Sequence, residues 1–233
     1  MALSKLLFTC LLSYTLAGCG AGPTPRLMNL VGEDAFAYRG LPPELSPEND
    51  EWMQVSNIGL VVHSDATGTN AAPPILSGYL ETLGRRTEEF LKQRCSFGEI
   101  LPVPPLSGPA NFSHELKIQG QRLQVPYEMV VLFSSRERAG PQKIGEATMM
   151  TQMSGTVIEN SALAEVGILR VSDFKMVFRA EGLATESLEQ LDVPIGANRP
   201  SAPDARDILR ARAGQQALDR ALEHVGSACQ RGK

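Results

Sequence analysis

Three adjacent residues, His63, Ser64 and Asp65, supply the side-chain types of a hydrolytic triad. A working triad needs side chains that converge in space, whereas neighbours on an extended segment point alternately to opposite sides. The chain also lacks the Gly-x-Ser-x-Gly motif that exposes a nucleophilic serine on a sharp turn in many hydrolases. We therefore interpret the cluster as the polar end of a strand, and we predict that the chain is not an enzyme.

Residues that could bind a metal ion are few and poorly spaced. The histidines of the chain are His63, His114 and His224. None of them stands at a metal-binding spacing from another histidine or from a cysteine. Met149, Met150 and Met153 could offer soft sulfur ligands, to copper in particular, but packing in a core explains them better. We expect no metal site.

A polar segment, Asp-Ala-Thr-Gly-Thr-Asn at residues 65–70, precedes an expected helix. Backbone N–H groups at a helix N-terminus can hold an anion, but the segment has neither the Gly-x-Gly-x-x-Gly nor the Walker pattern. We interpret it as a capped loop and predict no cofactor. The net charge of −4 and the lack of a basic run give no support for nucleic-acid binding.

The most specific motif lies near the N-terminus. Lys5 precedes a short apolar run that ends in Leu16, Ala17, Gly18 and Cys19. The run is too short to span a bilayer, which needs about 20 residues, and small residues before a cut are typical of secretory signals. The four residues resemble the lipobox of bacterial lipoproteins, whose cysteine receives lipid and becomes the new N-terminus.

The lipobox resemblance implies an address in the bacterial cell envelope. Residues 1–18 would be a signal peptide, and Cys19 would carry diacylglycerol and usually a further acyl chain such as palmitate, which together make a stable membrane anchor. Gly20 follows the cysteine. An Asp there retains lipoproteins in the inner membrane in the best-known sorting rule, so its absence favours the outer membrane, facing the periplasm. Ordinary secretion or an uncleaved anchor is the alternative.

Cys95 and Cys229 are left as a pair once the others are accounted for. Cys10 belongs to the signal peptide, and Cys19 is assigned to lipid. The remaining two follow expected amphipathic helices in a compartment that permits disulfides. We predict a Cys95–Cys229 disulfide, with two unrelated free thiols as the alternative.

Apolar periodicity predicts the elements that position these residues. A buried strand is expected at 55–63 and a short strand at 99–103, with long alternating strands at 123–133, 144–158 and 166–180. Turns are expected at 136–143 and 159–161, and residues 183–195 are ambiguous, a loop with a possible short helix. Residues 75–94 and the segment from about 204 to 225 have a helical apolar stripe.

These elements indicate an α/β (α+β) fold with a mixed, largely antiparallel sheet and two amphipathic helices packed on one face. Pro- and Gly-rich composition predicts a lipid-anchored flexible tether at residues 19–54, followed by a single periplasmic domain at 55–233. Trp52, the only tryptophan, lies where the tether would meet the domain, and we interpret it as a packing anchor.

Residues 55–104 faintly resemble the periplasmic domains of curli-secretion lipoproteins and penicillin-binding-protein activators, in a strand, polar loop and helix without a diagnostic residue. Such families bind proteins or lipids. The lipid anchor, the tether and the absence of a catalytic constellation favour a non-enzymatic, membrane-attached protein with an envelope protein partner, acting as an assembly or accessory subunit of a periplasmic or outer-membrane complex. The alternative is a carrier of a lipid or small apolar ligand. We expect binding through the loops at 65–70 and 104–113, since recognition concentrates in loops on rigid scaffolds.

Overall fold

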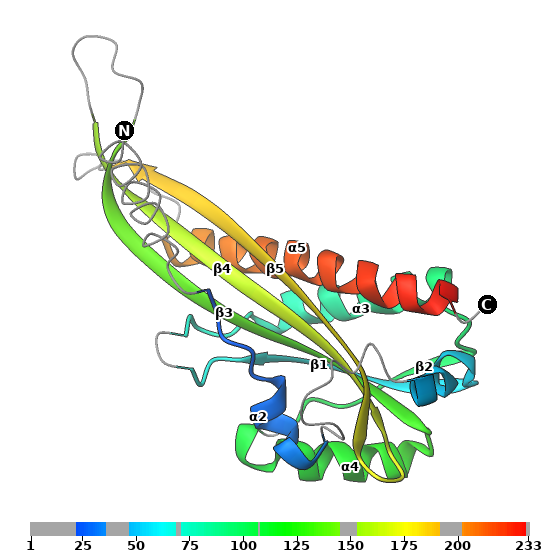
Figure 1. Cartoon of the computed structure of the whole chain (residues 1–233). Helices are drawn as coiled ribbons and strands as arrows, with labels where there is room; N and C mark the ends of the chain where they lie inside the picture. The colour runs from blue at the N-terminus through cyan, green and yellow to red at the C-terminus, as the bar shows by residue number, and fades with distance from the viewer. Residues whose placement is uncertain are drawn as a thin grey trace, which may run out of the picture.

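Five strands form one mixed sheet in the computed structural model of the chain, which describes residues 22–35, 47–68, 71–106, 108–144, 153–191 and 202–231. The strands are β1 (Asn57–Asp65), β2 (Glu99–Pro102), β3 (Tyr127–Ile144), β4 (Met153–Arg170) and β5 (Lys175–Leu191). Their order across the sheet is β2-β1-β3-β4-β5 (Figure 1). β1 pairs in parallel with β2 and β3, whereas β3, β4 and β5 pair antiparallel. The predicted mixed, largely antiparallel sheet is confirmed.

The antiparallel part is longer than the sequence suggested. Residues 136–143, expected to turn the chain, continue β3 instead. The first part of β3 pairs with both β1 and β4, whereas after Arg136, which bridges to Ala71, the strand pairs with β4 alone among the described residues. Such a strand edge tolerates the missing N–H of Pro141. The turn expected at 159–161 lies inside β4, and β5 runs through most of the segment left as loop.

One face of the sheet is covered by the two helices that were expected there, α3 (Ser77–Arg94) and α5 (Ala202–Arg231). α5 packs along β4 and β5, and α3 lies beside it over β1. Their buried residues join Met129, Val131 and Phe133 of β3 in one core cluster. The predicted placement of two amphipathic helices on one face is therefore confirmed, although Leu76, at the start of the α3 stripe, is 51% exposed.

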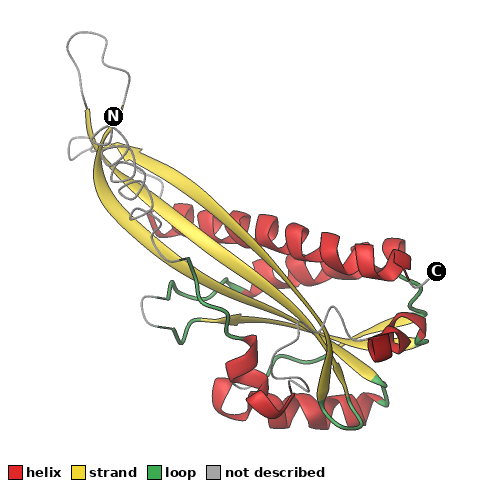
Figure 2. Ribbon diagram, in the orientation of Figure 1, coloured by secondary structure: helices red, strands yellow, loops and turns green. Residues whose placement is uncertain are grey.

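The opposite face is also covered, by two helices that were not predicted. These are α2 (Leu27–Val31) and α4 (Phe112–Leu123), with single-turn helices η1 (Glu33–Ala35) and η4 (Pro109–Asn111) beside them. Val130 and Leu132 of β3 pack against this layer in a second core cluster. Figure 2 shows the sheet between the two helical layers. Strand β3 is therefore buried on both faces over its first half.

The segment expected to be a flexible tether, residues 19–54, is folded wherever the structure describes it. Leu27, Leu30 and Val31 are buried against the sheet in the second core cluster. The helix η3 (Pro47–Gln54) ends the segment, and Trp52, which is 1% exposed, packs on Phe97 and Phe178. Trp52 is thus a packing anchor, as predicted. The flexible tether is a wrong interpretation for residues 22–35. Their Gly and Pro content suggested an extended segment, but four apolar side chains among them are buried.

Cys95 and Cys229 form a disulfide with a Cα–Cα distance of 5.1 Å. It joins the residue after α3 to the last turns of α5, so the two helices of one layer are covalently fixed at the same end. Among the described residues, no helix is long and apolar enough to cross a membrane.

We expect the Cys95→Ser, Cys229→Ser double variant to lose about 3–5 kcal/mol of unfolding free energy. The bond closes a loop with a sequence separation of 134 residues, and the entropy of such a loop in the unfolded chain gives this magnitude. Urea unfolding of the wild type with and without reductant, beside the double variant, measures it. Equal midpoints in all three samples would contradict the prediction.

Candidate functional site

The three residues that resemble a triad do not converge. Along β1, Leu60 belongs to the core cluster under α3 and α5, and Val61 to the cluster under α2 and α4. By the same alternation, His63 and Asp65 face the α2–α4 side, and Ser64 faces the other. The Ser64 hydroxyl accepts a hydrogen bond from the N–H of Ile75 at 3.0 Å. A serine on the far side of the sheet cannot be activated by this histidine.

His63 is used in packing. Its ring meets Phe112 of α4 edge-on, with ring centroids 5.3 Å apart. Burial lowers the pKa of His63, and the charge of Asp65 opposes that effect only in part. The imidazole is therefore uncharged at neutral pH, which suits its place against an aromatic ring.

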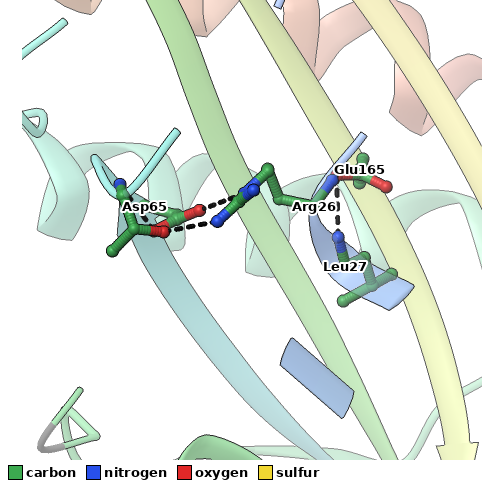
Figure 3. Close-up of polar contacts among 5 residues, drawn as sticks. Arg26, Leu27, Asp65 and Glu165 are labelled. Atoms are coloured by element: carbon green, nitrogen blue, oxygen red, sulfur yellow. Dashed lines mark hydrogen bonds and ion pairs between the residues drawn. The ribbon is translucent and has the colours of Figure 1, made fainter. Parts of the chain in front are cut away.

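Asp65 holds the N-terminal segment of the chain. Nε of Arg26 donates to Oδ2 of Asp65 at 2.9 Å, and Nη2 donates to the hydroxyl of Thr67 at 2.6 Å. The N–H and hydroxyl of Thr67 in turn donate to Oδ1 of Asp65, at 3.0 and 2.6 Å. Figure 3 shows the arginine side chain reaching across β3 to the end of β1. Burial alone would raise the pKa of Asp65, but the hydrogen bonds from Thr67 and Arg26 outweigh it and hold that pKa below its usual value.

The backbone of the same segment is held by Glu165 on β4. Its Oε2 accepts the N–H of Arg26 at 2.5 Å and that of Leu27 at 3.0 Å (Figure 3). Its Oε1 accepts from Arg179 at 2.8 Å. Burial raises the pKa of Glu165, opposed by the two backbone N–H groups and by Arg179. We call Arg26, Leu27, Asp65, Thr67 and Glu165 together the N-terminal clasp.

Apolar packing completes the clasp. Leu27 is fully buried over Gly167 of β4, where a Cβ would lie 2.6 Å from a methyl group of Leu27. Any larger residue at position 167 would displace the leucine. An isolated helix as short as α2, with five residues, is not stable in water, so α2 depends on these contacts.

A small pocket of about 80 Å³ adjoins the clasp. It is lined by Gly22, Pro23, Thr24, Arg26, Asp65, Gly68, Ala71, Ser134, Ser135 and Arg136. The Ser134 hydroxyl is buried and has no hydrogen-bond partner among the described residues. Sites for drug-sized ligands are several times larger, roughly 300–1,000 Å³. The pocket can hold water or a small polar solute, and it is too small for an acyl chain.

The two loops predicted to bind a partner meet the same side of the sheet. The first begins at Asp65, and the second leads into α4 at Phe112, which lies beside His63. Ala66 and Ala110 are exposed, one in each loop. Residues 69, 70 and 107 of these loops lie outside the described residues.

The remaining predicted site residues are scattered or undescribed. His114 is exposed on α4 and His224 on α5. The described residues contain no group of three or more His, Cys, Asp or Glu that could hold a metal ion. Cys19, Met149 and Met150 lie outside the described residues, so the lipidation of Cys19 stays a prediction.

No family model and no curated protein matches the chain. Solved structures do resemble it. A Helicobacter pylori protein named as a neuraminyllactose-binding hemagglutinin homologue has 7% identity over 76% of this chain and 89% of its own, with a TM-score of 0.42. Rare lipoprotein B from Shewanella oneidensis has 12% identity over 74% and 97%, with a TM-score of 0.30. A minor lipoprotein from Acinetobacter baumannii has 8% identity over 74% and 91%, with a TM-score of 0.32. Bacterial lipoproteins are thus among the chain's structural neighbours, and such TM-scores carry no argument about function.

Sequence reasoning missed a buried carboxyl, Glu128 of β3. It is fully buried, neither oxygen has a hydrogen-bond partner in the part of the chain that the structure describes, and burial raises its pKa to about 8. A Cβ at Gly120 of α4 would lie 2.9 Å from its carboxyl carbon, so the helix passes directly over it. The signal in the sequence was a glutamate that shares a strand face with the apolar Val130 and Leu132.

We expect Arg26→Ala to lower the unfolding free energy by about 1–3 kcal/mol, because it leaves the buried Asp65 carboxylate short of donors. The Asp65 side chain is 2% exposed. Arg86→Ala is the matched control, since the Arg86–Asp219 pair is 48% and 38% exposed, and such surface pairs contribute about 0–1 kcal/mol. Urea unfolding and thermolysin cleavage near α2 measure the effect. Equal stability and cleavage in both variants would refute the clasp.

We expect Glu128→Gln to stabilise the protein increasingly as pH rises above 4.5, the ordinary pKa of the group. Because the folded-state pKa of Glu128 is about 8, against an ordinary 4.5, wild-type stability falls as pH rises between these values. Glutamine cannot ionise, so the variant should match the wild type near pH 5 and exceed it by about 2–4 kcal/mol near pH 9. Urea unfolding across this range tests it, and parallel pH profiles would contradict it.

Proposed function

We propose that the chain is a non-enzymatic, lipid-anchored protein of the bacterial cell envelope that serves as an assembly or accessory subunit of a periplasmic or outer-membrane complex. The observation that carries the proposal is the hydrogen bond between Asp65 and Arg26. The residue that looked catalytic binds Arg26, which follows the lipobox cysteine, Cys19, by seven positions. The polar end of β1 therefore serves to attach the chain's N-terminal segment.

The lipid on Cys19 would supply the membrane partner. Gly20, in place of Asp, favours the outer membrane with the domain facing the periplasm. Two or three acyl chains hold a protein stably in a bilayer without a membrane-spanning helix. The anchor therefore accounts for membrane attachment through Cys19 alone.

The protein partner would bind at the loops that contain Ala66 and Ala110. Both residues are exposed, and both loops leave the ends of parallel strands on the α2–α4 side of the sheet. Loops on a rigid scaffold are the usual place for recognition. The alternative function, a carrier of lipid or a small apolar ligand, gains no support from a pocket of about 80 Å³.

The test uses the full chain in its native membrane. We expect mass spectrometry of the mature wild type to find diacylglycerol and an acyl chain on Cys19, and Cys19→Ser to leave the membrane fraction. After mild crosslinking, one defined envelope protein should co-purify with the wild type. Ala66→Arg and Ala110→Arg should lower its yield several-fold, and Gln121→Arg, on exposed α4, should not.

Two results would overturn this proposal. An unmodified Cys19 in the mature chain would remove the anchor. If His63→Ala abolished function in a protein that is normally folded and lipidated, catalysis would be favoured instead. Replacing a packed imidazole should otherwise affect stability alone.

A further inference from the structure

We infer that the clasp holds the domain directly against the bilayer, with one defined part of its sheet facing the lipid headgroups. This inference rests on the proposed lipidation of Cys19. It goes beyond that proposal because an anchor on a long tether would leave the orientation of the domain free. The bilayer is the partner, and the surface it meets is the exposed part of β5 on the side of the sheet opposite α5.

The distance from the lipid to the folded domain is set by three residues. Gly22 lies beside β5, where a Cβ built on it would be 3.7 Å from Cδ1 of Leu183. Cys19 precedes Gly22 by three positions, and three extended residues span at most about 10–11 Å. The acyl chains on Cys19 must enter the bilayer, so Leu183 lies within roughly one headgroup layer of it.

The clasp is what keeps this distance short. Without it, the next firmly buried side chain among the described residues after α2 and η1 is that of Trp52, 33 positions after Cys19. A flexible chain of that length spans roughly 30 Å root-mean-square. The hydrogen bonds of Arg26 and Leu27 to Asp65 and Glu165 therefore shorten the reach of the anchor about threefold.

The surface beside Gly22 is open among the described elements. Gly182 faces α5, since a Cβ there would clash with the carbonyl oxygen of Ala217 in that helix, and Ala184 is in the core under α5. The alternate residues Leu183, Thr185 and Ser187 therefore point to the opposite side, and all three are exposed. We call these three the membrane face. Figure 1 shows α2 and α4 covering that side of the sheet only at the other end of the long strands.

The composition of the membrane face suits an interface. Leu183 is 47% exposed, one of few large apolar side chains left in contact with solvent. On the same side of β5, exposed Glu181 precedes Leu183 and is paired with Arg179, while Thr185 and Ser187 follow with hydroxyl groups that can bind headgroup oxygens. An apolar side chain beside hydroxyls and a charge-paired carboxylate fits a bilayer surface, and α3 and α5 on the other side of the sheet would then face away from the membrane.

The experiment places a fluorescent donor at Ser187→Cys, or at Arg85→Cys on exposed α3, in the lipidated full chain bound to phosphatidylethanolamine–phosphatidylglycerol vesicles with acceptor headgroups. The disulfide leaves Cys95 and Cys229 unreactive. A sheet and a helix separate the two labels by about 20 Å. We expect energy transfer to be several-fold stronger from position 187 than from position 85.

Two further variants test the clasp. A 30-residue Gly/Ser insert between Ala21 and Gly22 leaves the domain unchanged and should abolish the difference between the labels. Arg26→Ala should reduce the difference, and Arg86→Ala should not. Near-UV circular dichroism checks that each variant keeps its tertiary structure.

Transfer from position 187 no stronger than from position 85, in protein whose intact mass includes the lipid, overturns the inference and leaves the proposed function standing. An insert that leaves transfer unchanged overturns it in the same way. An intact mass without lipid on Cys19 overturns both.

Discussion

The buried carboxylate of Glu165 is the constraint on which the N-terminal part of the structure depends. A carboxylate removed from water is very costly unless hydrogen bonds compensate it. Glu165 is fully buried and receives two backbone N–H groups, from Arg26 and Leu27, as well as the guanidinium of Arg179. Those N–H groups open α2 and would otherwise lack partners. Each side thus satisfies the other, and a helix of five residues persists because a strand supplies its N-terminal acceptor.

Glu128 shows what the same face of the sheet does to a carboxyl without partners. Both glutamates have a pKa raised by burial, but only Glu165 has hydrogen bonds that oppose the shift. Glu128 therefore stays protonated until about pH 8, and its space exists because Gly120 lets α4 pass close by. One buried acid organises the chain around itself, whereas the other is accommodated by the loss of its charge.

The elements that the sequence predicted best are those whose signal is local. The α3 and α5 stripes and the apolar run of β1 recur at their expected places, because each pattern needs only its own residues. The α4 stripe was missed since one of its three buried positions is Gly120. The clasp was missed for a different reason. Leu27 and its acceptor Glu165 are 138 positions apart, and no local pattern reports a contact of that separation. Composition then suggested a tether where long-range hydrogen bonds hold the chain.

The clasp also decides how a pull on the N-terminus would reach the sheet. Glu165 lies on β4, which has β3 on one side and β5 on the other, with partners at Leu132 and Glu181. Asp65 lies at the end of β1, on the far side of β3. A load on Arg26 is therefore divided between β4, which is hydrogen-bonded on both sides, and β1, which lies two strands away from β4 in the sheet. A segment held only at the edge strand could peel it away one hydrogen bond at a time, whereas this attachment requires the buried ion pair and the buried backbone hydrogen bonds to fail together. If Cys19 carries the proposed lipid, only three residues before Gly22, so short a connection has no slack to absorb the motion of a membrane, and the load would fall on this attachment.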